Sequence, residues 1–472
     1  MSTRPNFLVI MTDDQGAFSP GDRMPELITP TLDYLAATGR DFTRFFCASP
    51  VCSPARASLL TGRMPSAHGV HDWLRGTESG IDALGVHYLE GQSTTAMDLT
   101  TAGYRVGHAG KWHLGDARVP APGFRDWYAH RDGGGPYYGA PVIKDGREQT
   151  EPGYITDAIG DNAAAMLRAC ARGPEPFYLQ VHFTAPHTPW TEENHPDELL
   201  DVYRDCTFDS VPRPDRDPWA NPYFDAAFAD PVAALRGYCA SLTGVDRAVE
   251  RLVSILDETG ARDDTYIIFS SDNGFSCGHR GFWGKGNGTW PLNCWDPSVL
   301  VPFYVNRPGT IEPGVDSTLT SAVSLRPTIL ELAGLTPPED PLAAGTSFAN
   351  RLLAPPAVEP ADAEPIVILD EYGGTRMIRT DAHKLIVRRD GPDELYDLHQ
   401  DPGEERNLIA TATAASPSDV ETTLRDQLTE WFHRHATVEA DAFTRPVTGE
   451  GQTAPVFART SDDERYVPRP FA

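Results

Sequence analysis

The sequence predicts an α/β protein with a large, mainly parallel mixed sheet sandwiched by helices, followed by a small antiparallel sheet and a helix. Two observations lead to this fold class. Up to about residue 335, continuous apolar runs typical of strands covered on both faces alternate with amphipathic helical patterns. Beyond a stretch rich in Pro, Ala and acidic residues (343–364), which reads as a linker, short β-type runs follow one another between turn signals.

The first elements are a strand and a capped helix. Residues 6–12 (NFLVIMT) are apolar without alternation, which favours a buried strand. In residues 29–39, Thr29 stands as N-cap, Pro30 takes the first helical position and Gly39 follows the end. Helical spacing recurs over 157–171, 231–260 and 324–335, and residues 265–274 begin with another buried strand.

The C-terminal part reads as a separate small unit. The runs PIVILDEY, TRMIRT, HKLIVRR and DELYDL predict a four-stranded antiparallel sheet. Residues 419–436 form an amphipathic pattern, with Leu424, Leu428, Trp431 and Phe432 on one side of a helix. We therefore expect an α/β domain over 1–345, a subdomain over 365–440 and a C-terminal arm over 441–472.

Composition narrows the function classes. The chain has 67 acidic and 40 basic residues and a net charge of -27, which argues against nucleic acid and anionic membranes as partners. No apolar run approaches the roughly 20 residues of a membrane span, and the N-terminus lacks a signal-peptide pattern. We therefore expect a cytoplasmic location, where seven cysteines in so long a chain need no disulfide framework.

Oxygen-bearing pairs follow two of the predicted strands. Asp13 and Asp14 end the first strand, and Asp272 and Asn273 end the strand after residue 265. Ligands collect at the carboxyl ends of strands in such sheets, and an all-oxygen set selects Ca²⁺ or Mg²⁺. Either pair alone could be turn chemistry.

Cys52 stands at the start of a predicted helix, in the stretch SPVCSPARASLLTG. Pro54 fits the first turn, and Gly62 ends the pattern. A helix N-terminus lowers the pKa of a thiol, so a cysteine phosphatase is one reading, although three residues between Cys52 and Arg56 make too short a loop. A buried core cysteine is the other.

The string CSPAR followed by SLLTGR resembles the signature of type I sulfatases, members of the alkaline phosphatase superfamily. The resemblance implies that a formylglycine-generating enzyme oxidises Cys52 to formylglycine, with Pro54 and Arg56 guiding recognition. Matching segments recur in order along the chain, and the last resembles the family's C-terminal subdomain. They are NFLVIMTDDQG, AGKWHLG, TAPHTPW, SSDNG, GFWGKG and HKLIVRR with ELYDLHQDPGEERNL.

The resemblance implies one divalent cation, with Ca²⁺ preferred and Mg²⁺ as the alternative, and makes 1–345 the catalytic domain. The implied metal ligands are Asp13, Asp14, the modified Cys52, Asp272 and Asn273. The implied catalytic residues are Cys52, Arg56, Lys111, His113, His187, Lys285 and Asp272. His182 competes with His187 but lies inside a strand-like run, while His68, His71 and His108 are expected to be structural, with His71 a candidate pocket wall.

The implied nucleophile is the hydrated aldehyde of residue 52. One hydroxyl attacks sulfur while Asp272 manages its proton and Arg56 holds the diol in place. Loss of the proton on the second hydroxyl then releases sulfate and restores the aldehyde.

The other residues act on the substrate and the intermediate. Lys111 and Lys285 neutralise the sulfonyl oxygens, and His187 assists the departing oxygen. His113 takes the proton of the second hydroxyl. Together with the cation, these groups would make the site locally positive within an acidic protein.

The expected function is therefore a sulfuric ester hydrolase, arylsulfatase-like, acting on an alkyl, aryl or sugar sulfate. Two alternatives stay open: a phosphodiesterase or phosphonate monoester hydrolase of the same superfamily, and a non-catalytic metal-binding protein with an unmodified Cys52. We expect specificity to lie in the loops 131–148 and 191–224, whose Tyr and Trp residues could stack on a ring. The sequence leaves the oligomeric state open.

Overall fold

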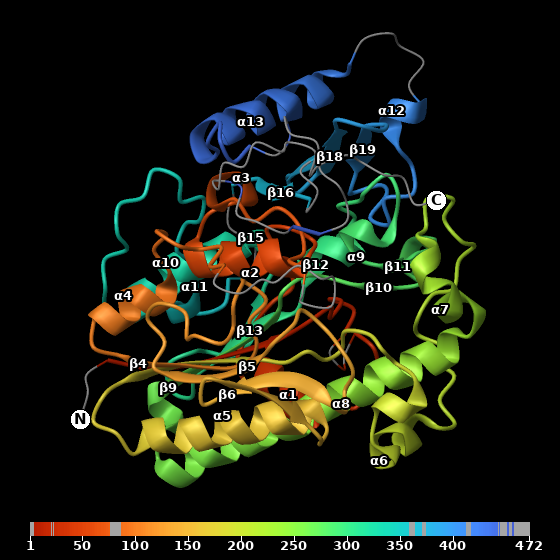
Figure 1. The fold of residues 1–472 in the computed structure, drawn as a ribbon. Coiled ribbons are helices and arrows are strands. Elements are labelled where there is room, and N and C mark those ends of the chain that lie inside the picture. The colour runs from red at the N-terminus through yellow and green to blue at the C-terminus, as the bar shows by residue number, and fades with distance from the viewer. Residues whose placement is uncertain are drawn as a thin grey trace.

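A computed structural model gives the fold of the chain (Figure 1). It describes residues 4–19, 21, 23–75, 86–357, 364–370, 374–411, 417–441, 443, 451–452 and 456. Within these residues, no helix is both long and apolar enough to cross a membrane.

A ten-stranded mixed sheet forms the centre of the molecule, in the order β14-β2-β13-β9-β1-β8-β4-β5-β6-β7. Its middle is parallel, because β1 pairs in parallel with β8 and β9, and β4 with β8 and β5. The antiparallel pairs are β13 with β9 and β2, and β6 with β5 and β7. The strands are β1 (Asn6–Thr12), β2 (Arg40–Phe42), β4 (Arg105–Lys111), β5 (Asp126–His130), β6 (Ala140–Lys144), β7 (Arg147–Glu151), β8 (Phe177–His182), β9 (Thr265–Ser271), β13 (Phe303–Asn306) and β14 (Gly314–Asp316).

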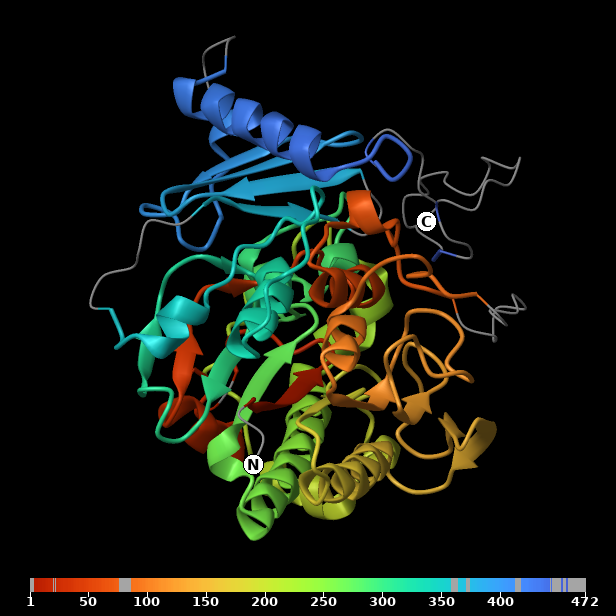
Figure 2. The same cartoon turned by 90° about the vertical axis from the view of Figure 1, so that its left-hand side faces the viewer.

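Helices cover both faces of this sheet, as Figures 1 and 2 show. One face carries α1 (Pro30–Ala37), α5 (Ile155–Ala171) and α8 (Pro231–Thr259), and α5 and α8 run side by side. The other face carries α2 (Cys52–Thr61), α4 (Thr95–Thr101), α10 (Leu325–Leu332) and α11 (Ala349–Leu353). The remaining helices are α3 (Pro65–His68), α6 (Asp197–Leu200), α7 (Asp225–Ala229), α9 (Asp296–Val299), α12 (Leu408–Thr411) and α13 (Asp419–His435).

Strand β1 is apolar over nearly its whole length because its two faces pack into different cores. Along β1, Leu8 and Ile10 join the core under α5 and α8, while Phe7, Val9 and Met11 join the core on the opposite face. This is the arrangement that an unbroken apolar run predicts. Thr29 is the N-cap of α1 as expected, but its hydroxyl donates to the Asp33 carboxylate at 3.2 Å and caps no backbone N–H.

The C-terminal unit has the predicted four-stranded antiparallel sheet, β16 (Ile366–Leu369), β17 (Thr375–Arg379), β18 (His383–Arg388) and β19 (Glu394–Asp397), in sequential order. Helix α13 packs across this sheet through Leu424, Leu428 and Phe432 (Figure 2). Short ladders complete the fold: β10 (Ser276–Cys277) with β11 (Trp283–Gly284), and β12 (Leu300–Val301) with β3 (Phe45–Phe46) and β15 (Thr320–Ser321).

Two segments differ from the sequence prediction. The predicted linker contains α11, preceded by a buried Phe348 that packs against Phe42 and Phe303. The predicted loop 131–148 contains β6 and the start of β7, joined by Asp145 and Gly146, both at positive φ as a tight hairpin turn requires. The domain limits 1–345, 365–440 and 441–472 stay a prediction, and most of the arm lies outside the described residues.

Candidate active site

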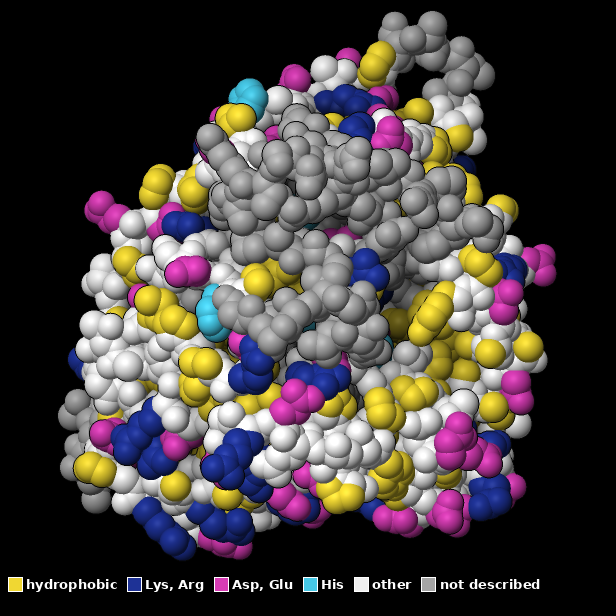
Figure 3. Space-filling view, viewed as in Figure 1, with side chains coloured by type: hydrophobic (Ala, Val, Ile, Leu, Met, Phe, Trp, Pro, Cys, Tyr) yellow, Lys and Arg dark blue, Asp and Glu magenta, His cyan; other side chains and the backbone are white. Residues whose placement is uncertain are grey.

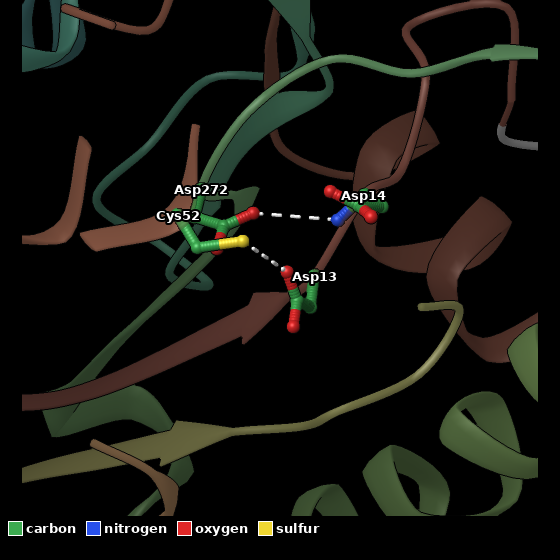
Figure 4. Close-up of side chains that lie close together, drawn as sticks. All are labelled: Asp13, Asp14, Cys52 and Asp272. Carbon is green, nitrogen blue, oxygen red and sulfur yellow. Dashed lines mark hydrogen bonds between the residues drawn. The ribbon is translucent and has the colours of Figure 1, made fainter. Parts of the chain in front are cut away.

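The carboxyl ends of β1 and β9 bring the predicted acid pairs together (Figure 4). The two strands pair in register up to Thr12 and Ser271, so Asp13 and Asp272 follow at the same edge of the sheet. The backbone N–H of Asp14 donates to Asp272 Oδ1 at 3.3 Å. One ligand atom from each of Asp13, Asp14, Cys52 and Asp272 fits in a group whose members lie within 4.8 Å of one another.

This group fits a hard divalent cation. The carboxylates of Asp13, Asp14 and Asp272 are buried close together, where like charges need positive charge nearby. The amide of Asn273 donates to Asp14 Oδ1 at 2.7 Å, while its carbonyl Oδ1 is buried without a hydrogen-bond partner among the described residues. A buried amide oxygen beside three carboxylates offers the oxygen-rich set that Ca²⁺ and Mg²⁺ prefer.

Cys52 is the first residue of α2, and Gly62 ends that helix in the left-handed conformation, as the sequence predicts. Its Sγ lies 3.1 Å from Asp13 Oδ1, and Lys285 Nζ donates to Sγ at 2.8 Å. Burial, followed by the charge of Asp13, raises the pKa of the thiol well above its usual value. Desolvation and a neighbouring carboxylate outweigh the effect of the helix N-terminus on the thiol pKa, which adds to the short Cys52–Arg56 spacing as an argument against the cysteine phosphatase alternative.

Three cationic side chains reach the acid cluster, each paired with a different carboxylate. Arg56 binds Asp272 Oδ2 through Nε at 2.9 Å, and also donates to the Lys111 carbonyl at 3.0 Å. Lys111 Nζ contacts Asp13 Oδ2, and Lys285 Nζ contacts Asp14 Oδ1 at 2.7 Å.

These pairs decide the charge of the site. Burial alone would raise the pKa of Asp272, but Arg56, Lys111 and Lys285 hold it below its usual range. Burial would lower the pKa of Lys285, but the charge of Asp14 outweighs it, and the pKa of Lys285 rises well above its usual value. Because three cations meet three carboxylates, the net positive charge expected from the sequence requires a bound cation.

The two predicted histidines reach the site from different loops. His187 Nδ1 donates to the Thr188 carbonyl at 2.9 Å, which leaves Nε2 facing Asp14 Oδ2 at 3.8 Å. His113 Nε2 donates to the Leu74 carbonyl at 2.8 Å, and its Nδ1 is buried without a described partner. Burial, together with the charge of Lys111, lowers the pKa of His113 well below its usual value, so its free nitrogen is an acceptor.

A glycine-rich turn covers both rings. A Cβ on Gly133 would lie 2.2 Å from His113 Cε1, and a Cβ on Gly134 would lie 2.9 Å from His187 Cε1. Real Cβ atoms do not approach that closely, so Gly133 is required for the packing of His113. Sequence reasoning placed this turn in a specificity loop, and the Gly-Gly-Gly run was the available signal for a close backbone approach.

The other histidines lie around the site. His182 ends β8 and lies 3.4 Å from an Arg56 amino nitrogen, so it supports Arg56 from behind. His68 pairs with the Ser58 hydroxyl at 2.9 Å, and His108 packs edge-on against Trp112. His71 is buried and does not line the pocket described next, which overturns the expectation that it is a wall residue.

A pocket of about 930 Å³ opens onto Cys52, Asp14, His113, His187 and Lys285. Its outer wall comes from four stretches of the chain that lie far apart in the sequence. The outer-wall residues are Trp73, Leu74, Arg75, Asp132, Asn221, Tyr223, Phe224 and Asn287. On the face drawn in Figure 3, hydrophobic side chains gather over the region of α7, next to basic and acidic ones.

One wall of this pocket depends on Gln452 of the C-terminal arm. Gln452 is buried, and its backbone bonds to Trp73 O at 2.8 Å and Arg75 N at 3.2 Å. Its amide donates to Gly69 O at 2.9 Å and accepts from His71 N at 2.9 Å. No sequence pattern marks Gln452, because the contact joins two irregular segments far apart in the chain.

Comparison with known proteins gives one family and several relatives. The family model described as "Sulfatase" matches residues 5–335. The chain is 29% identical to the choline-sulfatase of Rhizobium meliloti (strain 1021), over 90% of this chain and 86% of that protein. It is 30% identical to the ulvan-active sulfatase of Formosa agariphila, over 86% of this chain and 77% of that protein.

Solved structures share the fold. The structure of Ps i-CgsB in complex with k-i-k-neocarrahexaose has a TM-score of 0.71 and 26% identity, covering 91% of this chain and 93% of its own. The phosphonate monoester hydrolase of Agrobacterium radiobacter has a TM-score of 0.68 and 21% identity, covering 95% of this chain and 99% of its own, which supports the fold alone.

Proposed function

The chain belongs to the sulfatase family and is a sulfuric ester hydrolase, and from this premise we propose that residue 52 acts as formylglycine beside one calcium ion. The observation that carries the proposal is the placement of Cys52. At the N-terminus of α2, its side chain lies among Asp13, Asp14 and Asp272 and contacts Lys285. A thiol whose pKa is raised well above its usual value is a weak nucleophile. Replacement of the Cys52 sulfur by oxygen would provide a nucleophile at this position.

The cation would be held by Asp13, Asp14, Asp272 and Asn273 through oxygen, with residue 52 as a further ligand. When bound, it supplies the positive charge that lowers the pKa of the attacking hydroxyl. We propose Ca²⁺ over Mg²⁺, because the cluster offers several carboxylates and an amide oxygen, while Mg²⁺ keeps more of its water.

The cationic side chains would then serve the transferring group. Lys285 contacts Cys52, and Lys111 contacts Asp13 beside it. Each lysine is already anchored on a carboxylate, so both need little reorganisation to face sulfonyl oxygens. Arg56 lies behind them, held by Asp272 and the Lys111 carbonyl, and fixes Asp272 in place for proton handling.

The histidines would handle the remaining protons. His187 lines the pocket with Nε2 exposed to a bound ester, which suits a group that assists the departing oxygen. His113 presents an unprotonated Nδ1 to the same pocket, which suits acceptance of a proton from residue 52.

Maturation would precede folding. Cys52 and Arg56 are each at most 3% exposed in the folded chain, so a modifying enzyme has no access to them there. We propose that the formylglycine-generating enzyme acts on the unfolded or nascent segment. The cytoplasmic location stays a prediction.

The substrate is a sulfate ester. One relative is named for choline sulfate, another for ulvan, and one structural neighbour is complexed with a carrahexaose, so we propose a small alcohol or saccharide sulfate here. The pocket of about 930 Å³, with its aromatic wall, is large enough for a sugar ring.

The test is a panel of aryl, choline and sugar sulfates, with a phosphate diester and a phosphonate monoester as competitors. We expect sulfate release to dominate and to need both Cys52 and a divalent cation. The half-buried Cys206 provides a matched control: Cys206→Ser should retain activity, and Cys52→Ala should lose it. Preferred hydrolysis of the phosphonate monoester would favour the alternative function.

A further inference from the structure

The outer wall of the active-site pocket carries Arg75, which forms no ion pair with a carboxylate of the described residues. Arg75 lines the pocket, and its Nε is buried with no hydrogen-bond partner among the described residues. Arg56 and Lys285 each hold a carboxylate within 2.9 Å, whereas none of the described carboxylates lies within ion-pair distance of Arg75. A partly buried, unpaired guanidinium is costly, which points to a ligand that completes it.

The acids around Arg75 are already engaged elsewhere. Asp72 accepts hydrogen bonds from the backbone N–H groups of Trp73 at 2.7 Å and Gly451 at 3.1 Å. Asp132, which also lines the pocket, binds Arg131 at 2.7 Å. Burial raises the pKa of Asp72 well above its usual value, although the charge of Arg75 acts in the opposite direction.

The groups next to Arg75 suit a ring. Trp73 is half-buried in the same wall, and Tyr223 is 74% exposed at the rim, so both present aromatic surface to the pocket. The side-chain amide of Asn287 has no hydrogen-bond partner among the described residues, and its backbone carbonyl accepts from Asn221 at 3.0 Å. Aromatic surface with a few polar groups and one cation is a recognition surface for an anionic ring alcohol.

We propose that Arg75 binds a second anionic group, carried by the alcohol portion of the sulfate ester. The preferred substrates are then sulfates of ring alcohols that also bear a carboxylate or another sulfate. This inference rests on the proposed function of the site, because it assigns the remainder of the same substrate. It also separates this chain from its choline-sulfatase relative, since Arg75 repels a cationic alcohol.

Two matched ester pairs test the proposal. The first pair is phenyl sulfate and its para-carboxyl derivative. The second pair is N-acetylglucosamine sulfate and the N-sulfated glucosamine sulfate. The first pair tests a carboxylate as the second anionic group, and the second pair tests a sulfate. Arg75→Gln should lower the ratio of kcat/KM for the anionic member over the neutral member by about 10-fold to 100-fold in at least one pair. In the Arg75→Gln protein, kcat/KM for choline sulfate should rise relative to kcat/KM for the neutral esters.

Arg172→Gln is the control, because Arg172 is exposed at the end of α5 and should leave all ratios unchanged. The proposal is overturned if Arg75→Gln keeps both ratios at their wild-type values. A binding measurement separates this outcome from failure of the proposed chemistry. In the Cys52→Ala background, calorimetry should show weaker binding of the anionic esters after Arg75→Gln.

If the wild-type protein hydrolyses none of the esters, the proposed function of the site fails while calorimetry still decides the role of Arg75. Equal affinity for the anionic and neutral members, with or without Arg75, would overturn the role given to Arg75 here.

Discussion

The Cys52 side chain meets a carboxylate and an ammonium group at once, since Sγ lies within hydrogen-bond distance of Asp13 Oδ1 and Lys285 Nζ. That setting keeps a thiol protonated, but it would orient an oxygen nucleophile toward a bound ester. In the proposed mechanism, the chemistry of residue 52 depends on the number of hydroxyl groups that it carries.

Cys52→Ser tests this dependence. Serine supplies one hydroxyl, which can attack sulfur once but has no second hydroxyl to release the sulfate. We expect turnover to fall to background while intact-protein mass spectrometry shows a sulfate group on residue 52. Cys206→Ser, at a half-buried cysteine, should turn over normally. Steady-state hydrolysis by the Cys52→Ser protein would show that the second hydroxyl is unnecessary.

His187→Ala tests the role at the leaving group. Because Nδ1 is held by Thr188 O, only Nε2 can serve a bound ester. Removal should cost about 10²-fold to 10⁴-fold in kcat/KM on esters of poorly acidic alcohols, and much less on esters of activated phenols. The measurement compares two esters that differ in leaving-group acidity, with exposed His399→Ala as control. Equal losses on both esters would contradict the assignment.

Much of the inner site could be predicted residue by residue. Asp13 and Asp272 follow neighbouring parallel strands, and parallel strands end at one edge of a sheet. The pKa of Cys52 could not be predicted, because it depends on burial and on the carboxylate that the fold brings beside it. The need for glycine at position 133 depends likewise on how closely His113 packs.

At the scale of elements, the segment 69–75 contributes to the pocket in two ways. It provides Trp73 and Arg75 to the wall and the Leu74 carbonyl to His113. Gln452 holds this segment through both its backbone and its amide. The arm thus acts on His113 through the segment 69–75.

Gln452→Ala should therefore affect catalysis as well as stability. It leaves Gly69 O and His71 N buried without the amide, at a cost of about 1–3 kcal/mol. We expect kcat to fall on good and poor leaving groups alike, because His113 loses its fixed position, and the thermal midpoint Tm to fall as well. Gln452→Glu, which keeps an acceptor for His71 N, should recover part of kcat. The exposed Gln400→Ala is the control.

A purely structural role for Gln452 would give a different result. The Tm would fall, but kcat measured well below that temperature would stay at the wild-type value. The sequence did not reveal this contact, whereas the β6–β7 hairpin was signalled by Asp145-Gly146 and could have been predicted.

At the scale of the whole molecule, the sequence predicts the layers correctly because buried strands and amphipathic helices leave a strong periodic signal. The docking of the C-terminal sheet left no such signal. It uses a buried ion cluster in which Lys384 contacts Asp296 and Glu404, and Arg379 binds Asp296 at 2.9 Å. Asp296 begins α9, eleven residues after Lys285 in the sequence.

Calcium binding should raise the stability of the whole fold. An ion that binds only the folded state adds about 2.7 kcal/mol at a hundredfold excess over its Kd, so Tm of chelator-treated protein should rise by roughly a few degrees. Asp14→Asn should abolish the shift, and Asp257→Asn, at an exposed helix position, should keep it. A larger shift with Mg²⁺ than with Ca²⁺ would contradict the proposed metal.

The mass of the tryptic peptide that spans Phe45 to Arg56, taken from protein that is releasing sulfate from an aryl ester, tests the central claim most directly. The account predicts that residue 52 has lost its sulfur and gained one oxygen, as an aldehyde, in a fraction that rises and falls with activity across preparations. A peptide that carries only the unmodified thiol, in protein with full activity, would contradict it.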